Sequence, residues 1–266
     1  MRIIVPIKQI LDPSGLTFRR DKERFFVNRE EYIIDPGSKS AVEAALRLKG
    51  DGDQGSGETG RTVTALSVGK PQADDALREA LAMGCDAAYL LSDEAFKEAD
   101  VSVTTRILAA AIDQLGGADL IVAGRESGDT GAGQIGPRLA EALGYTQITD
   151  VYALAAGGRG IEATRRWGNG YATVEASLPA VVTVAPEAFP PRYAHGARIM
   201  SAYREWDVPV WNADDLELAE AALTPLLTQR GVSFPPPLEV GEVFQGDATS
   251  IAQDVIAVLR QQKAIA

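Results

Sequence analysis

The sequence has little of what disulfide frameworks, zinc sites and catalytic triads require. Among its 266 residues there is one cysteine, Cys85, and one histidine, His195. A single cysteine excludes an intrachain disulfide and any site built on several cysteine ligands, so Cys85 is expected to be a small buried apolar residue. A lone imidazole does not make a catalytic triad, and we interpret His195 as a loop residue. With no paired carboxylates or regularly spaced ligands either, we predict no catalytic residue and no metal site.

Basic charge and long apolar runs are also scarce. The formal net charge is −11 and the pI is near 4.7, which opposes binding to nucleic acid, because a phosphate backbone requires a basic surface. The longest early apolar run, Ile3 to Ile7, is interrupted by Pro6 and followed by Lys8, so it fits neither a secretory signal nor a membrane span. We therefore expect a soluble, cytoplasmic globular protein that is not itself a membrane protein.

The most informative stretch runs from Asp119 to Gly144. A short apolar run, Asp119 to Ala123, is followed by thirteen residues with five glycines and then by apolar residues at helical spacing, which stop at Gly144. The pattern predicts a strand, a glycine loop and a helix. Such a loop delivers backbone N–H groups to a helix N-terminus, where the macrodipole favours an anion, so the expected ligand is a phosphate.

The glycine loop matches one nucleotide-binding motif incompletely. Gly131 to Gly136 has the G-x-G-x-x-G spacing, but that motif follows its strand directly and here about seven residues intervene. The phosphate loop G-x-x-x-x-G-K-[ST] is absent, because no Lys-Ser or Lys-Thr follows these glycines. It remains open that the glycines only shape a long turn between a strand and a helix.

The chain before this stretch alternates between predicted strands and helices. Strands are expected at Arg2 to Lys8, Thr62 to Val68 and Ala87 to Leu91, a hairpin at Thr17 to Arg20 and Phe25 to Asn28, and helices from Ser38 as N-cap, from Pro71, and over Val101 to Leu115. This order predicts an α/β fold, a Rossmann-like parallel sheet flanked by helices. Because ligands of such sheets bind at the carboxyl ends of the strands, the loops after Lys8, Val68 and Ala123 should converge on one site.

The second half of the chain has a different character. We predict a β-meander at Gln147 to Ala155, Gly160 to Arg166 and Tyr171 to Ala176, a buried strand at Leu178 to Thr183, a stiff exposed loop at Ala185 to Met200, a short acidic helix at Asp214 to Ala222, a spacer at Pro235 to Pro237 and a final amphipathic helix at Ile251 to Gln262. A polar loop without assigned function is expected at Asp51 to Gly60. The domains are therefore predicted as 1–205 and 206–266, the latter a helical tail that packs on the first domain or on a partner chain.

Three collinear stretches of the sequence resemble the β subunit of electron transfer flavoproteins, the FixA-like family. They are IIVPIKQILDPSG with its hairpin and DPGSKSAVEAALRLK; ALSVGKPQADDALREALAMGCDAA; and GRESGDTGAGQIGPRLAEALG with SLPAVVT and PPRYAHGARIM. The resemblance runs from residue 1 to about residue 205. It implies a fold similar to that of the adenine-nucleotide α-hydrolases.

The resemblance also implies a heterodimer and its cofactors. In this family an α subunit carries most of the site for a redox-active FAD, and the β subunit binds AMP or, in an electron-bifurcating group, a second FAD. The positions of this sequence that match the nucleotide site of the family are Pro6, Ile7, Lys8, Asp35, Pro36, Gly37, Ser38, Val68, Gly124, Arg125, Ser127, Gly128, Asp129, Thr130, Gly131, Ala132, Gly133, Gln134 and Ile135. Those that match the partner-recognition segment are Arg192, Tyr193, Ala194, His195 and Gly196. The implied redox partners are a dehydrogenase or a flavoprotein-quinone oxidoreductase, with NADH as a possible donor and quinone or ferredoxin systems as acceptors.

For the site in this chain we predict a second FAD rather than AMP. Residues 131–133 are Gly-Ala-Gly and remove side chains where a pyrophosphate would pass, which suits a dinucleotide. Asp129 and Thr130 are predicted to bind ribose or phosphate and Gln134 to donate to phosphate, although ordinary loop and helix-cap residues would look the same.

The sequence departs from the family pattern in two places. Gly168-Asn169-Gly170 and Ala172 stand where the family normally has acidic residues and a Glu or Gln before the SLPAVVT strand. The recognition segment lacks the leucine and the lysines of mitochondrial members, since Gly196 and residues 201–205 stand there. A mitochondrial-type acyl-CoA dehydrogenase is therefore expected to be a poor partner.

Two other functions are considered beside the electron-transfer subunit. A stand-alone nucleotide-binding module of the universal-stress type would be a flavin-free monomer or homodimer and would leave the tail unexplained. An NAD-dependent oxidoreductase needs an acidic residue about 20 residues past the glycines, and the nearest, Asp150, begins a meander. We therefore interpret the chain as an electron carrier that is redox-active only with its α subunit.

Overall fold

The computed structural model describes residues 1–19, 24–50, 60–157, 160–228, 230–231, 241 and 243–265. Its contacts divide the chain into one unit of Met1–Gln229 and a smaller one of Arg230–Ala266. The first unit includes the strand β13 (Val210–Trp211) and the short 3-10 helix η6 (Glu220–Leu223), both after residue 205. The spacer predicted at Pro235 to Pro237 and all but the last residue of the loop predicted at Asp51 to Gly60 lie outside the described residues.

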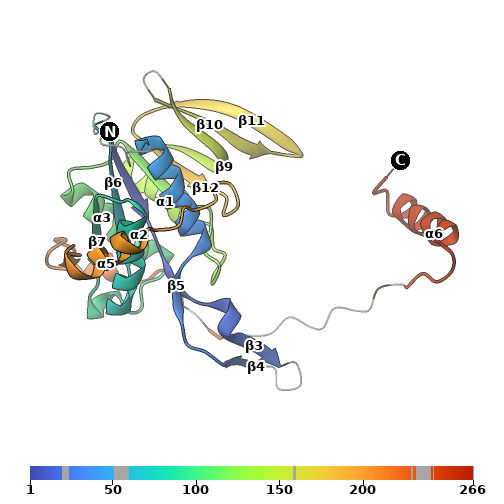
Figure 1. Ribbon diagram of the computed structural model, residues 1–266, viewed down its shortest axis with the longest axis horizontal. Coiled ribbons are helices and arrows are strands. Elements are labelled where there is room, and N and C mark those ends of the chain that lie inside the picture. The colour runs from blue at the N-terminus through green and yellow to red at the C-terminus, as the bar shows by residue number, and fades with distance from the viewer. Residues whose placement is uncertain are drawn as a thin grey trace. The chain divides into compact units, whose positions relative to one another are not determined.

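The first unit is built on a nine-stranded sheet with the order β11-β10-β9-β12-β8-β1-β6-β7-β13 (Figure 1). The remaining strands of this sheet are β1 (Arg2–Pro6), β6 (Thr62–Val68), β7 (Ala87–Leu91), β8 (Leu120–Gly124), β9 (Thr146–Gly157), β10 (Gly160–Trp167), β11 (Gly170–Ser177) and β12 (Ala180–Val184). The pairs from β9-β12 through to β7-β13 are parallel, whereas β9, β10 and β11 form an antiparallel meander. The predicted α/β fold with a β-meander is thus confirmed.

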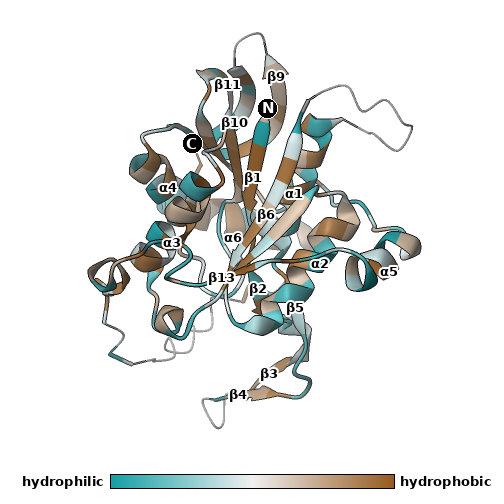
Figure 2. Ribbon diagram, turned by 90° about the vertical axis from the view of Figure 1, so that its left-hand side faces the viewer, coloured by the Kyte–Doolittle hydropathy of each residue, from teal (hydrophilic) through white to brown (hydrophobic). Residues whose placement is uncertain are grey.

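Helices cover both faces of the sheet. They are α1 (Pro36–Lys49), α2 (Asp74–Met83), α3 (Val101–Gln114) and α4 (Ile135–Leu143). Because side chains alternate along a strand, Ile3 and Val5 of β1 join the buried cluster of α1 and α2, whereas Ile4 joins that of α3 and α4. Most of β1 is coloured as hydrophobic in Figure 2, as a strand buried on both faces must be. Cys85 is buried in the first cluster, as predicted, and burial raises the pKa of its thiol to about 12.

Two smaller pairs of strands precede α1. The predicted hairpin is formed by β3 (Leu16–Arg19) and β4 (Arg24–Val27), and it projects from the sheet in Figure 1. A second pair, β2 (Gln9–Leu11) with β5 (Tyr32–Ile34), connects the hairpin to the sheet. In the smaller unit, the predicted amphipathic helix is present as α6 (Ala248–Gln261).

The prediction that Ser38 caps the first helix was wrong. The helix begins three residues earlier, with Pro36 in its first turn, and its N-cap is Asp35, whose side chain accepts from the Ser38 N–H. Asp is a better cap than Ser here because its charge also complements the helix dipole.

The segment from Ala185 to Met200 is a loop only in its first part. From Gly196 the chain forms the helix α5 (Gly196–Arg204), capped by His195, whose Nδ1 accepts from the Ala197 N–H at 3.2 Å. The prolines that suggested a loop all precede residue 192, so they do not interrupt this helix.

The acidic helix predicted at Asp214 to Ala222 does not form. Asn212 and Asp215 hydrogen-bond each other's backbone N–H groups and close a turn, and Glu217 has a left-handed backbone with φ 52°. Such local side-chain bonds compete with a helix, and only the 3-10 turn η6 follows.

Gly136, in the first turn of α4, has no room for a side chain. A Cβ built there would lie far inside contact distance of Thr183 Cγ2 in β12. We expect Gly136→Ala to lower the free energy of unfolding by about 1–3 kcal/mol, because overpacking pushes the helix off the sheet. Denaturant unfolding checks this, with Gly157→Ala as control, since its Cβ would meet no described atom within 4 Å. Equal stability of the two variants would contradict the close packing.

Candidate functional site

The candidate site lies where the loop after β8 meets the N-terminal end of α1. A Cβ built on Gly124 would lie 2.8 Å from the carbonyl carbon of Gly37, and one built on Gly37 would lie 2.8 Å from the carbonyl oxygen of Glu126. The two backbones therefore touch, and glycine is required at both positions. Two of the segments that the sequence assigned to one site are in direct contact.

Asp35 fastens the glycine loop to α1. Its buried carboxylate accepts hydrogen bonds from the N–H of Ser38 at 3.0 Å and from the N–H of Gly128 at 2.7 Å. The protein itself thus supplies the anion at the N-terminus of α1. The other helix N-terminus beside this loop is that of α4, whose N-cap side chain makes no capping bond within the described chain.

Lys8 joins the end of β1 to the same loop. Its backbone N–H donates to Ser38 Oγ at 3.0 Å, and its Nζ lies 2.6 Å from Asp129 Oδ2. Burial alone would raise the pKa of the Asp129 carboxyl, but hydrogen bonds from Lys8 and Ser127 outweigh it and hold that pKa below its ordinary value. The two paired side chains are 42% and 39% exposed, so a ligand can reach both.

The N-terminus of α4 is open to a ligand. Gln134 is its N-cap, but within the described chain its side chain makes no capping bond and instead accepts from Arg138 Nε at 3.0 Å. Gly131 and Gly133 precede it with left-handed backbones, φ 58° and 62°. The first turn carries two N–H groups, those of Ile135 and Gly136, because Pro137 has none, and neither has an acceptor within the helix.

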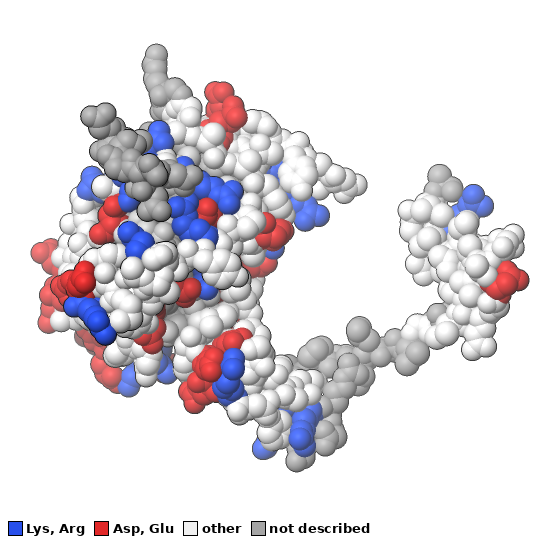
Figure 3. All heavy atoms as spheres, viewed as in Figure 1, with Lys and Arg blue, Asp and Glu red and all other residues white. Residues whose placement is uncertain are grey.

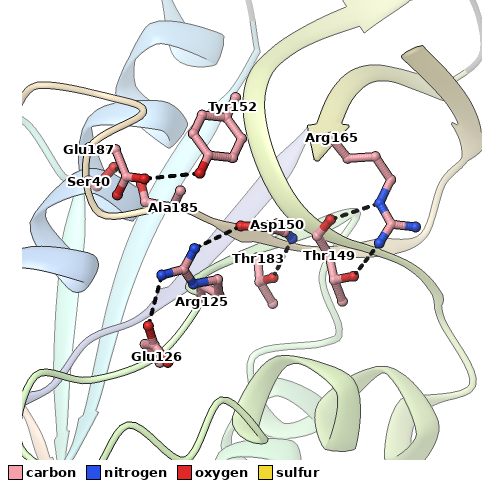
Figure 4. A network of polar contacts seen from close by, with 10 residues as sticks. All are labelled: Ser40, Arg125, Glu126, Thr149, Asp150, Tyr152, Arg165, Thr183, Ala185 and Glu187. Atoms are coloured by element: carbon pink, nitrogen blue, oxygen red, sulfur yellow. Dashed lines mark hydrogen bonds and ion pairs between the residues drawn. The ribbon is translucent and has the colours of Figure 1, made fainter. Parts of the chain in front are cut away.

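Arg125 is held at the mouth of the loop by two carboxylates (Figure 4). Its guanidinium donates to Glu126 at 2.8 Å and to Asp150 at 3.0 Å, and these bonds raise its pKa further. Asp150 interrupts the ladder of β9 with φ 58°, and its N–H donates to Thr183 Oγ1 at 3.1 Å. Asp150 thus fixes the orientation of the Arg125 guanidinium, a role that no sequence motif indicates.

A cavity of about 320 Å³ opens between α1 and the glycine loop. Its lining residues are Asp35, Pro36, Gly37, Glu126, Ser127, Gly128, Gly131 and Pro186. Glu126 lies within the predicted glycine loop, whereas Pro186 was not among the predicted site residues. Nothing in the local sequence of Pro186 distinguishes it, because the fold alone brings residue 186 to this loop.

Most of the other predicted residues are not among those that line this cavity. Pro6 and Ile7 are buried at the end of β1, and Val68 is half-buried at the end of the neighbouring β6. Gln9 Nε2 donates to the carbonyl of Gln72 at 2.8 Å, which ties the loop after β1 to the one after β6. Ser127 and Thr130 contact each other within the glycine loop at 3.0 Å, and Ala132 is exposed. Their binding of a nucleotide stays a prediction.

The predicted recognition segment lies beside α1 and α2. Arg192 contacts Glu43 of α1, Tyr193 is fully exposed, Ala194 is half-buried and His195 and Gly196 begin α5. A larger cavity of about 410 Å³ adjoins Tyr193 and Tyr203. We regard this cavity as part of the recognition segment, because no residue of the glycine loop lines it.

Neither a metal site nor a face of one charge is seen among the described residues drawn in Figure 3. Among the described residues no three His, Cys, Asp or Glu side chains are placed to hold a metal ion. Acidic and basic side chains alternate over the face of the first unit drawn in Figure 3. None of the described helices has the length and hydropathy needed to cross a bilayer.

The family and its members are identified by comparison with known proteins. The family model described as electron transfer flavoprotein domain matches residues 25–216. Electron transfer flavoprotein subunit beta of Clostridium acetobutylicum is 35% identical over 98% of this chain and 99% of its own length. Caffeyl-CoA reductase-Etf complex subunit CarD of Acetobacterium woodii is 34% identical over the full length of both chains, and Protein FixA of Azorhizobium caulinodans is 35% identical over 81% of this chain and 76% of its own. The chain therefore belongs to the electron transfer flavoprotein family, among its β subunits.

Proposed function

We propose that this electron-transfer chain works as one half of a heterodimer with an electron transfer flavoprotein α subunit that carries FAD. The name of the Acetobacterium woodii relative, a subunit of a reductase-Etf complex, supports a multisubunit assembly. Electrons would pass between this heterodimer and a dehydrogenase or a flavoprotein-quinone oxidoreductase. Cytoplasmic location stays a prediction of the sequence.

The glycine loop is proposed to hold an adenine nucleotide. The observation that carries this is the pair of left-handed glycines, Gly131 and Gly133, in front of the open N-terminus of α4. A Cβ built on Gly131 would meet no described atom within 4 Å, so its backbone is open to a ligand. The residues present fit phosphates, since helix N–H groups and the ammonium of Lys8 favour anions.

We propose that this nucleotide is FAD. A pyrophosphate needs a longer clear path than a single phosphate, and Gly131-Ala132-Gly133 is exposed throughout. When bound, a flavin supplies the exchange of one or two electrons, which protein side chains do not provide. The chain's own part is to bind and orient it through the α4 N-terminus, Lys8 and Asp129. A second flavin is what electron bifurcation requires in this family, and we propose that reaction for the heterodimer.

Ligand extraction from the purified heterodimer tests this assignment. Chromatography of the extract is expected to give two FAD molecules and no AMP per heterodimer. One FAD with one AMP would reject the bifurcating function but keep the nucleotide site. A heterodimer with FAD on the α subunit alone would reject both.

The recognition segment is proposed to dock the redox partner. Besides Tyr193, the side chains of Ile199, Met200 and Tyr203 on α5 are exposed, so the segment presents apolar surface. We expect replacement of Arg192 and Tyr193 by alanine to slow electron transfer with protein partners about tenfold or more, because an exposed aromatic anchor such as Tyr193 contributes strongly to an interface. Nucleotide content should not change. Unaltered transfer with every donor and acceptor would show that the segment is only structural.

The two alternative functions are not favoured. Two of the relatives are named as electron transfer subunits, electron transfer flavoprotein subunit beta and acryloyl-CoA reductase electron transfer subunit gamma. Asp150, the acid that an NAD-binding site would need, is bound to Arg125 instead.

A further inference from the structure

One face of α1 holds the loop that leads into the recognition segment. Ser40 Oγ donates to the carbonyl of Ala185 at 2.9 Å and accepts from the N–H of Phe189 at 3.3 Å. One turn further, Glu43 binds Arg192, and after another turn Arg47 donates to the carbonyl of Pro190 at 3.2 Å. Spacings of three and four residues place Ser40, Glu43 and Arg47 on the same side of the helix.

Glu43 is the centre of these contacts. Its Oε2 accepts from Arg192 Nε at 2.8 Å and from the Arg192 N–H at 3.2 Å, while its Oε1 accepts from Arg192 Nη2 at 3.3 Å and Arg47 Nε at 2.8 Å. Both carboxylate oxygens are thus occupied, and the bond to the Arg192 N–H fixes the backbone as well as the side chain.

The burial of this carboxylate makes the contact costly to break. The side chain of Glu43 is 5% exposed, whereas those of Arg47 and Arg192 are 48% and 33% exposed. Burial alone would raise the pKa of the Glu43 carboxyl, but the hydrogen bonds of Arg192 and then Arg47 outweigh it and hold that pKa below its ordinary value. Because the carboxylate is buried, removing an arginine partner leaves its charge poorly compensated, which costs more than breaking a fully exposed pair.

The recognition segment is tied down again on its far side. Arg198 of α5 donates to the carbonyls of Leu81 and Ala82 at the end of α2, both at 3.0 Å. Tyr193 lies between this anchor and the Glu43–Arg192 pair, with its side chain fully exposed. Fixing both ends lowers the entropy that the segment loses when a partner binds.

We infer that Glu43 is a positioning residue for partner recognition: it holds Arg192 so that Tyr193 and the start of α5 are presented in a preformed conformation. In this arrangement the guanidinium of Arg192 binds Glu43. The exposed side chains around Arg192 contact the partner. This inference rests on the docking role proposed above. It concerns a protein partner of the heterodimer and not the nucleotide site.

Hydrogen exchange of the intact heterodimer tests the positioning without any partner. In Glu43→Gln, which keeps the shape but loses the charge, we expect the Arg192 amide to exchange about tenfold faster or more, because its acceptor is weakened. The Gly128 amide, bound to Asp35, should keep its protection. Unchanged exchange at Arg192 would overturn the inference. Arg192→Gln breaks the same pair from its more exposed side and serves if Glu43→Gln folds poorly.

Steady-state kinetics then test partner recognition. The electron donor is a bacterial acyl-CoA dehydrogenase that reduces the unmodified heterodimer, and its concentration is varied. We expect Glu43→Gln to raise the KM for this dehydrogenase about tenfold while kcat changes by less than about twofold, the pattern of lost binding. Glu94→Gln, the same charge change in the surface pair with Lys97, is the matched control and should leave KM unchanged. The double variant Glu43→Gln, Arg192→Gln should have a KM no higher than that of either single variant, because both substitutions remove the same contact.

The outcomes distinguish the positioning role of Glu43 from the docking role of the recognition segment. If Tyr193→Ala raises KM but Glu43→Gln does not, the positioning role is wrong and the docking role stands. If Tyr193→Ala leaves KM unchanged, the docking role itself is wrong. Additive effects of the double variant would also contradict a shared contact.

Discussion

Gly131→Val is expected to empty the nucleotide site of this chain while the flavin of the α subunit stays bound. Gly131 has φ 58°, a conformation that a β-branched residue avoids, and its open surface is where we place the phosphates. The unfavourable backbone conformation and the space taken by the valine side chain both act at residue 131. Together they should lower the ligand content of the site about tenfold or more, which corresponds to about 1.4 kcal/mol or more of binding free energy.

Quantitative extraction of FAD and AMP from purified heterodimer measures this effect. The matched control is Gly157→Val at the end of β9, where φ is not left-handed and a Cβ would meet no described atom within 4 Å. Control and unmodified protein should carry the same ligands. Full occupancy in Gly131→Val would show that the glycine loop does not bind the nucleotide.

Deletion of residues 230–266 is expected to abolish the heterodimer. Ile251, Val255, Val258 and Leu259 form an apolar stripe at helical spacing on α6. None of the residues of α6, all of which the structure describes, is buried. Such a stripe is stable in water only when another surface covers it, and we propose that the α subunit does so.

Sedimentation of the α subunit coexpressed with the shortened chain measures the loss of the heterodimer. The deleted chain should still unfold cooperatively, because both buried clusters consist of residues before 230. Leu259→Asp, on the stripe, should weaken association, whereas Gln253→Asp, on the opposite side of the helix, should not. A deleted chain that still sediments with the α subunit would contradict this role of the tail.

Local signals explain which parts of the fold could be predicted. The strand, glycine loop and helix from Asp119 to Gly144 follow from an apolar run, five glycines and helical periodicity, all within one short stretch. The first helix was placed with the wrong cap because Asp35 and Ser38 both suit that position, and only the structure shows the carboxylate at the Ser38 N–H. The helix α5 was missed because its cap is a histidine, which is not a typical N-cap residue.

Long-range contacts explain what could not be predicted. Glu43 and Arg192 are 149 positions apart, and Asp150 reaches Arg125 only because the ladder of β9 shifts register there. Neither pair leaves a pattern in one sequence. The same holds for the cavity, where Pro186 meets the glycine loop through the fold alone.

The central claim is that this chain is the nucleotide-carrying β subunit of an electron transfer flavoprotein heterodimer. Native mass spectrometry of the coexpressed chains tests it most directly, because it gives subunits and ligands in one spectrum. The account predicts one mass, that of one α subunit, one β subunit and two FAD molecules. A flavin-free β chain that remains alone in the presence of the α subunit would contradict it.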